Sequence, residues 1–148
     1  MSSTEPSTSP PVSLNVVDSS GWIEFFTAGP NGPGFRAVIA EQERLVVPTI
    51  ALYEVCKVLS RKLEPSLVAS CLDVMRMGQV VDLTDSRAIA AAQASRAHGL
   101  ALADAAMYSI AQEHGATFWT QDVDYEGLPG VRYLVKRPEQ PALRRPGP

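Results

Sequence analysis

The chain has 148 residues, of which 45% are hydrophobic and 20% are charged, and its formal net charge is −3. These values are ordinary for a globular protein, and the length suits one domain with its own core. The negative net charge excludes attraction of nucleic acid by a positive field of the whole molecule. No apolar run approaches the ~18 residues that are needed to cross a bilayer.

Both ends of the chain differ in composition from its middle. Residues 1–13 are rich in Ser, Thr and Pro and lack the basic and apolar blocks of a secretory signal, while residues 137–148 are proline-rich and basic. We predict flexible tails over these two ranges and one folded domain over 14–136. Cys56 and Cys71 form no CxxC pair, which indicates free thiols in a reducing cytoplasm.

Short apolar runs alternate with helical patterns at the start of this domain. The runs "LNVV" at 14–17 and "RLVVP" at 44–48 predict buried strands, because β-branched residues favour strands. Between them, the patterns at 20–26 and 35–43 predict short helices. The sequence "GPNGPG" at 29–34 combines Gly with Pro and therefore predicts a loop.

The next segment, residues 49–65, has the apolar spacing of an amphipathic helix that Thr49 is placed to cap. Its predicted buried face consists of Leu52, Cys56, Leu59 and Leu63. A helix at 66–78 and a strand at 80–83 follow.

A longer helix is predicted over 84–99, opened by Thr84 or Asp85 and closed by Gly99. The remaining predicted elements are a helix around Asp104, a strand at 116–120, a turn at 126–130 and a strand at 131–135. Strands that alternate with helices predict an α/β fold, here a three-layer sandwich with a central, mostly parallel sheet. Such sheets bind ligands at the carboxyl ends of their strands.

Acidic residues follow these predicted strands. Asp18 comes directly after the first strand, and Asp122 and Asp124 follow the strand at 116–120. Glu54 lies in the helix that leaves the second strand. Asp104 lies in the first turn of its helix, where an acid also interacts favourably with the helix dipole. We expect Asp18, Glu54 and Asp122 to meet at one edge of the sheet. No strand is predicted directly before the helix of Asp104, so the pattern leaves open whether this acid joins them.

Carboxylates that gather without cations repel one another by roughly 4 kcal/mol per pair at about 4 Å. Either they stay apart, or some of them hold protons, or a divalent cation resolves the conflict. An all-oxygen site without His or Cys suits Mg²⁺ or Mn²⁺ rather than zinc. The two histidines, His98 and His114, lie near predicted helix ends and show no metal-ligand spacing.

Each acid also has a simpler interpretation. Asp18 can be a loop acid or a helix cap, and Glu54 can pair with Lys57 three residues on. Asp122 and Asp124 can be turn formers. The residues alone leave the metal site and these alternatives open.

Four segments of the chain resemble the PIN-domain ribonucleases, and most closely the VapC toxins of bacterial and archaeal toxin–antitoxin pairs. The segments are "VVDSSGWIEFF", "LVVPTIALYEVCKVL", "GLALADAAMYSIAQEHGATFWTQDVDY" and "GLPGVRYL". The resemblance runs from about Asn15 to Leu134, which is nearly everything outside the predicted tails.

The resemblance implies a Mg²⁺- or Mn²⁺-dependent endoribonuclease with a PIN-like fold. The residues that match the family's catalytic and metal-binding acids are Asp18, Glu54, Asp104 and Asp122, with Asp124 as an auxiliary ligand. Ser20 and Thr120 match the family's supporting hydroxyl residues. Ser19 stands where the family commonly has Thr, and Tyr125 where Phe is usual, which leaves open whether Asp122 or Asp124 lies closer to the metal.

The resemblance also implies partners: an RNA substrate, a second copy of the chain in a homodimer, and a VapB-type antitoxin whose C-terminal segment blocks the pocket. No membrane partner is expected. Lys57, Arg61 and Lys62, together with the basic C-terminal residues, are candidates for phosphate contacts or simply solvated charges.

Two other functions compete with the nuclease. A PIN-like module that binds RNA or protein without cutting is the first, although a binder gains nothing from acids that repel phosphate. A phosphoacceptor receiver domain is the second, but it needs a Lys on a later strand, and "ATFWTQD" has none.

Overall fold

The computed structural model describes residues 13–138, and all the strands in this range run parallel. The strands are β1 (Asn15–Val17), β2 (Val46–Pro48), β3 (Gln79–Val81), β4 (Thr117–Thr120) and β5 (Val131–Tyr133). They form the ladders β1-β4-β5 and β2-β3, which a bridge between Asn15 and Leu45 joins. The resulting spatial order is β3-β2-β1-β4-β5.

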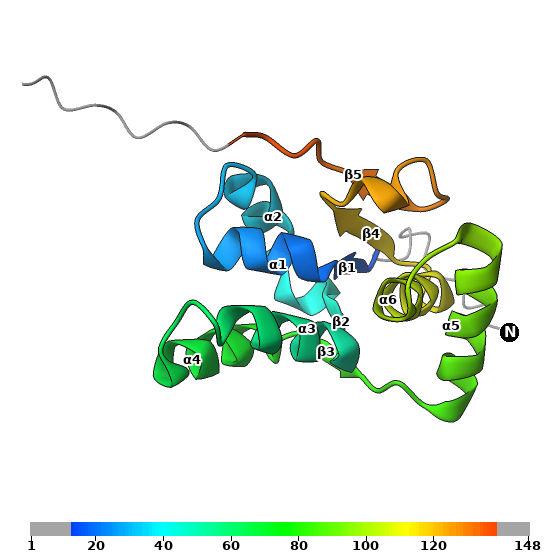
Figure 1. The fold of residues 1–148 in the computed structure, drawn as a ribbon, viewed down its shortest axis with the longest axis horizontal. Coiled ribbons are helices and arrows are strands. Elements are labelled where there is room, and N and C mark those ends of the chain that lie inside the picture. The colour runs from blue at the N-terminus through cyan, green and yellow to red at the C-terminus, as the bar shows by residue number, and fades with distance from the viewer. Residues whose placement is uncertain (1–12, 139–148) are drawn as a thin grey trace, which may run out of the picture.

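Helices cover both faces of this sheet, and Figure 1 shows α1 to α4 on one side of the strands and α5 and α6 on the other. The helices are α1 (Ser19–Phe26), α2 (Gly32–Ile39), α3 (Thr49–Leu59), α4 (Pro65–Met75), α5 (Asp85–His98) and α6 (Leu102–Glu113), with short 3₁₀ turns η1 (Gln42–Arg44) and η2 (Val123–Tyr125). The predicted three-layer α/β sandwich is therefore confirmed. The predicted tails lie, apart from residues 13, 137 and 138, outside the described residues.

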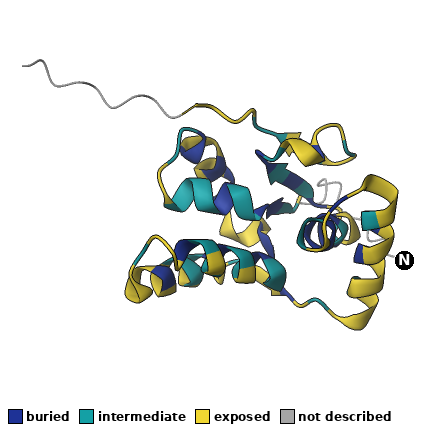
Figure 2. Cartoon of the chain, viewed as in Figure 1, coloured by how far each residue is buried: buried dark blue, intermediate teal, exposed yellow. Residues whose placement is uncertain are grey.

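The core lies where the central strands meet the helices. Val16 and Val17 of β1 and Val46 and Val47 of β2 are at most 1% exposed, and Figure 2 shows these central strands and the inner helix faces as buried. Burying each such side chain stabilises the fold by about 1.5–3 kcal/mol. Between residues 13 and 138, none of the helices has the length and apolarity that crossing a membrane requires.

The first turn of α1 packs unusually close to β1. A Cβ atom on Gly21 would lie 2.7 Å from the ring of Phe35 and 2.8 Å from the side chain of Val17. Glycine is therefore required here, because any other residue would push α1 away from the sheet. This turn carries Asp18, Ser19 and Ser20, so the close packing sets their position.

Several of the predicted boundaries are wrong. The helices expected over 35–43 and 49–65 end at Ile39 and Leu59. The loop expected at 29–34 ends at Asn31, because Gly32 and Pro33 lie in the first turn of α2, where a proline costs no hydrogen bond. Thr49 is the first residue of α3 rather than its cap, a position that Pro48 occupies. The Thr49 hydroxyl instead accepts a hydrogen bond from the Leu83 N–H at 3.3 Å.

The buried face of α3 also differs from the prediction. Ala51, Val55 and Leu59 are fully buried, whereas Leu52 and Cys56 are half-buried. The small side chain of Ala51 gives a weak apolar signal, yet it belongs to the hydrophobic core. By contrast, the ends of α5 are confirmed: the Thr84 hydroxyl caps it by accepting from the Arg87 N–H, and Gly99 ends it at φ +69°.

Candidate metal centre

Four segments bring acidic side chains to the edge at which the parallel strands end. Asp18 directly follows β1, Asp122 lies two residues after β4, and Glu54 lies on the helix that leaves β2. Asp104 is the third residue of α6. The carboxylates of Asp18, Asp122 and Glu54 are near enough to Asp104 to raise its pKa. The structure therefore brings these acids together in one region of the molecule.

Three of the carboxylates form a tight group. Asp104, Asp122 and Asp124 each offer an oxygen atom, and these oxygens lie within 4.8 Å of one another. The 3₁₀ turn η2 returns Asp124 to the site, since its N–H donates to Asp122 Oδ1 at 3.0 Å. We call these three residues the aspartate cluster. Asp122 and Asp124 both belong to it, so the structure brings both candidate ligands to the site.

Asp18 is fixed beside this cluster by hydroxyl and amide donors. Its Oδ2 accepts from Ser20 Oγ at 2.7 Å and from Thr120 Oγ1, and its Oδ1 accepts from the Ser20 N–H at 3.1 Å. The side chain is 2% exposed, and this burial raises the pKa of Asp18 while the hydrogen bonds act in the opposite direction. The predicted supporting residues Ser20 and Thr120 thus hold Asp18 in one orientation.

Ser19 connects Asp18 to Glu54, a role that sequence reasoning missed. The Ser19 hydroxyl oxygen lies 3.1 Å from Asp18 Oδ1 and 2.9 Å from Glu54 Oε1. A hydroxyl has one proton, so it donates to one of these carboxylates at a time. Among the described residues Glu54 makes no ion pair with Lys57, in contrast to the simpler interpretation of this acid.

The carboxylates of the site are close together and have no ion-pair partner among the described residues. Burial raises the pKa of Asp104 to about 6, and the carboxylates of Asp18, Asp122 and Glu54 add to the shift, while the nearby Tyr125 hydroxyl opposes it. Between residues 13 and 138, no Lys, Arg or His forms an ion pair with any of these acids. The described part of the chain therefore supplies no ion-pair partner for these acids.

Tyr125 is the second residue that sequence reasoning missed as part of the site. Its side chain is fully buried, and its hydroxyl lies near Asp104 without a hydrogen bond of good geometry. Burial raises the pKa of Tyr125, and the charges of Asp18 and Asp104 raise it further, so the phenol stays neutral. The available signal was a tyrosine at a position where the resembled family usually has phenylalanine.

The donor set fits a hard divalent cation. All the converging ligand atoms are oxygens, which Mg²⁺ and Mn²⁺ prefer, and a cation would relieve the repulsion that adds to the effect of burial on the pKa of Asp104. Neither histidine contributes: His98 ends α5, and His114 Nδ1 lies 2.8 Å from the Ile110 carbonyl oxygen at the far end of α6.

Comparison with known proteins identifies a family for most of this chain. The model of the PIN domain family matches residues 16–130, which includes every acid of the site. Among curated proteins, none matches the sequence significantly.

Solved structures share the fold at low sequence identity. A toxin–antitoxin complex from Klebsiella pneumoniae superposes with a TM-score of 0.68 at 18% identity, covering 80% of this chain and 95% of that one. A DNA-bound VapBC from Salmonella typhimurium gives 0.66 at 18% identity, covering 82% and 97%. The Sarcin-Ricin loop cleaving toxin VapC20 of Mycobacterium tuberculosis gives 0.62 at 17% identity, covering 74% and 91%. At these identities the likeness establishes the fold.

Proposed function

Because the chain belongs to the PIN domain family, we propose that it is a metal-dependent endoribonuclease that hydrolyses RNA phosphodiester bonds. In this proposal it acts in the cytoplasm as the toxin of a VapBC-type toxin–antitoxin pair and forms a homodimer. One observation carries the proposal. Acids from four separate segments converge without a countercharge from the described part of the chain, at the edge where α/β sheets bind ligands.

The proposed ligands are the aspartate cluster together with Asp18, while Glu54 would hold the metal through water or orient the attacking water. When bound there, Mg²⁺ or Mn²⁺ lowers the pKa of a coordinated water and offsets charge on the phosphate oxygens and leaving group.

The protein's own contribution is orientation. Ser20 and Thr120 hold the Asp18 carboxylate through three hydrogen bonds, so this acid loses little freedom when it binds a ligand. Ser19 can keep Glu54 directed at the site, which leaves the second oxygen of this carboxylate free to accept a proton from water. Without a cation, the same negative charges repel a phosphodiester, so cleavage should depend strictly on added metal.

The antitoxin is proposed from the structural neighbours. The matched structures from Klebsiella pneumoniae and Salmonella typhimurium are toxin–antitoxin assemblies, and they cover most of this chain. A VapB-type protein encoded beside this gene, with a C-terminal segment that blocks the metal centre, is the corresponding partner. Co-expression of the neighbouring open reading frame tests this, because a true antitoxin copurifies with the chain and suppresses its cleavage of RNA.

The experiment that tests the nuclease is a Mn²⁺ titration against cleavage of a structured RNA. We expect the wild-type chain to cleave only with metal, and Asp104→Asn to lose about 100-fold or more of the rate, because losing a ligand costs at least as much as losing a residue that orients one. Equal cleavage by the variant, or no cleavage by the wild type, rejects the proposal. The second outcome favours the alternative, a PIN-like module that binds RNA or protein without cutting.

A further inference from the structure

A groove opens beside the aspartate cluster, and the proposed chemistry leaves it without an assigned occupant. Its volume is about 470 Å³, and it is lined by Ser20, Gln121, Asp122, Val123, Tyr133 and Lys136. Two of these residues, Ser20 and Asp122, also belong to the candidate metal centre. The volume lies within the roughly 300–1,000 Å³ range of small-ligand sites, so the groove can hold a group attached to a phosphate at the centre.

The register of the sheet places an aromatic ring next to the acids. Tyr133 of β5 pairs with Thr120 of β4, and the Thr120 hydroxyl donates to Asp18. Paired residues of neighbouring parallel strands share a face and lie about 4.8 Å apart. The half-buried Tyr133 ring is therefore one strand away from the hydroxyl that fixes Asp18.

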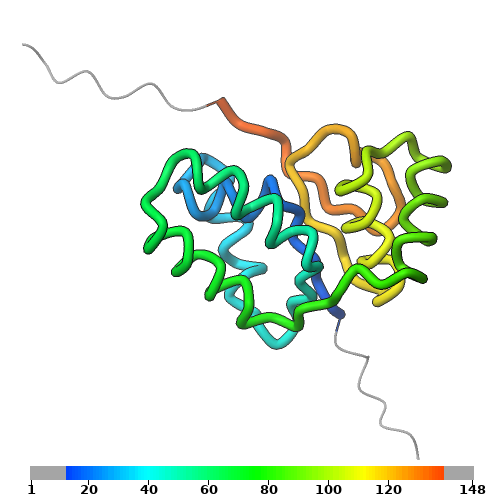
Figure 3. The backbone as a smooth tube through the Cα atoms, turned by 60° about the horizontal axis from the view of Figure 1, so that its bottom comes forward, coloured from blue at the N-terminus to red at the C-terminus, as the bar shows by residue number. Residues whose placement is uncertain are grey.

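The segment after β5 places a cation on the same groove. The Leu134 N–H donates to the Thr120 carbonyl at 2.8 Å, and Asn31 Nδ2 donates to the Val135 carbonyl at 3.0 Å. These two bonds hold the backbone directly before Lys136. Figures 1 and 3 show this segment leaving β5 and running toward α1 and α2.

A buried polar network keeps this wall of the groove in place. Asn31 Nδ2 also donates to Gln121 Oε1 at 3.0 Å, and Gln121 Nε2 donates to Glu24 Oε2 at 2.9 Å. Glu24 Oε1 in turn accepts from the Asn31 N–H at 3.1 Å. Asn31 and Gln121 are 5% and 7% exposed, so their bonds are protected from water. The groove is thus preformed rather than assembled by its ligand.

We propose that this groove is the subsite for the nucleotide next to the scissile phosphate, with its base stacked on Tyr133 and a phosphate against Lys136. This inference rests on the proposed nuclease function. RNA is the occupant that the lining favours, because single-stranded RNA presents bases that stack on aromatic rings and phosphates that pair with cations. Val123, which is 61% exposed, adds an apolar edge beside the ring.

The test measures cleavage of one single-stranded oligoribonucleotide with Mn²⁺ in four variants. Tyr133→Leu removes the ring, and we expect its KM to exceed that of Tyr133→Phe, which keeps the ring, by about 5-fold or more. Lys136→Ala should raise KM and make binding less dependent on salt by about one phosphate contact. Arg132→Ala is the matched control, since it removes the same charge from an exposed neighbour on the opposite face of β5.

A thermal shift with Mn²⁺ alone accompanies the kinetics. All four variants should keep the wild-type shift, because none removes a proposed ligand of the metal. If Tyr133→Leu and Lys136→Ala raise KM no more than Arg132→Ala, the subsite is rejected while the nuclease stands. Weakened capture of a protein partner with unchanged RNA kinetics also rejects it, since the groove would then bind protein.

If the wild type does not cleave, the proposed function fails, and fluorescence anisotropy with the same oligoribonucleotide still decides the subsite. Weaker binding by Tyr133→Leu and Lys136→Ala than by Arg132→Ala supports it. Equal binding by all three variants, or no binding by the wild type, overturns it.

Discussion

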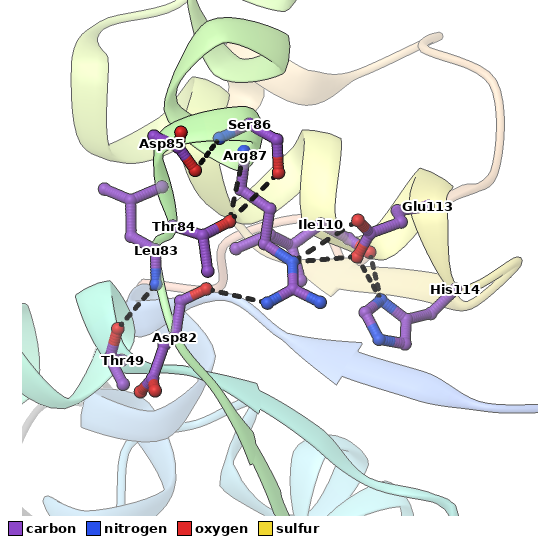
Figure 4. A network of polar contacts seen from close by, with 10 residues as sticks. All are labelled: Thr49, Asp82, Leu83, Thr84, Asp85, Ser86, Arg87, Ile110, Glu113 and His114. Atoms are coloured by element: carbon purple, nitrogen blue, oxygen red, sulfur yellow. Dashed lines mark hydrogen bonds and ion pairs between the residues drawn. The ribbon is translucent and has the colours of Figure 1, made fainter.

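Helix α6 carries an acid at each end, and the two acids have opposite surroundings. Glu113, its last residue, accepts from Arg87 Nε at 3.3 and 3.0 Å and lies 3.3 Å from His114 Nδ1 (Figure 4). Asp104, in the first turn, has no ion-pair partner among residues 13–138 and faces other carboxylates. The ion pair of Glu113 with Arg87 is a structural contact within the fold. The acids around Asp104 have no such partner in the described residues, so a bound cation is the countercharge that we propose for them.

The helix dipole sharpens this difference. It favours an acid at the N-terminus and disfavours one at the C-terminus, so Arg87 compensates for an unfavourable position of Glu113. Asp104 has the favourable position, and yet its pKa is raised to about 6. It forms no capping hydrogen bond either, since Ala101 occupies the cap of α6. A role as a helix-start acid therefore does not account for Asp104.

The largest expected effect comes from neutralising Asp104, the acid at the first turn of α6. Asp104→Asn should leave the metal-free protein as stable or more stable, because it relieves repulsion, and should abolish the thermal shift produced by Mn²⁺. At a Mn²⁺ concentration about 100-fold above Kd, that shift corresponds to about 2.7 kcal/mol. Glu113→Gln is the matched control and should keep the shift. A strongly destabilised metal-free Asp104→Asn protein would mean that the acid serves the helix rather than a metal.

The pH dependence of stability gives the next largest effect. A carboxyl whose pKa is about 6 when folded and about 3.9 when unfolded takes up a proton on folding, so metal-free stability falls as pH rises between these values. Allowing for the partial exposure of Asp104, the loss is about 1–2 kcal/mol. Thermal unfolding from pH 4 to 7, compared with Asp104→Asn, isolates this contribution. Equal pH profiles for the two proteins would contradict it.

Two buried tyrosines extend the comparison to hydroxyl groups. Tyr108, in the middle of α6, donates to the Pro129 carbonyl at 2.7 Å and accepts from Gln112 Nε2 at 2.8 Å. The Tyr125 hydroxyl beside Asp104 makes no hydrogen bond of good geometry with any residue between 13 and 138. In urea unfolding, Tyr108→Phe should cost about 1 kcal/mol, whereas Tyr125→Phe should cost nothing or stabilise. A clear loss of stability in metal-free Tyr125→Phe would reveal a bond to Asp104.

The smallest effect is expected at the paired end of α6. Arg87→Ala removes a partly exposed ion pair with Glu113 and a hydrogen bond from Nη1 to the Asp82 carbonyl. Such pairs contribute about 0.2–1 kcal/mol, less at high salt, which thermal unfolding with and without salt measures. The Mn²⁺ shift should not change. A lost shift would show that the two ends of the helix are coupled.

The sequence was sufficient for features that depend on local order along the chain. Asp18 and Asp122 follow strands, and the carboxyl ends of parallel strands meet at one edge, so their convergence could be predicted. The pattern alone did not place Asp104 at this edge, because no strand directly precedes α6. Its assignment to the site rested on the resemblance to a family. Thr84 and Gly99 were predicted correctly as helix ends because their signals are local.

Features set by tertiary packing were not accessible from the sequence. The position of Ser19 between two carboxylates depends on the distance between α1 and α3, which no spacing encodes. The burial of Tyr125 follows from its packing against Phe118 and Tyr108, with ring centroids 4.7 and 6.4 Å away. The burial of Ala51 likewise depends on which helices cover α3.

The close packing at Gly21 determines where the first turn of α1, and with it Asp18, lies in the site. The missing side chain of Gly21 lets α1 approach Val17 and Phe35, and the same turn carries the hydroxyls that bind Asp18. A mutation to alanine would add one methyl group to a tightly packed interior, and its main consequence should be a displaced Asp18 carboxylate. If Asp18 binds the metal as proposed, Gly21→Ala should weaken the binding of Mn²⁺ in protein that is still folded.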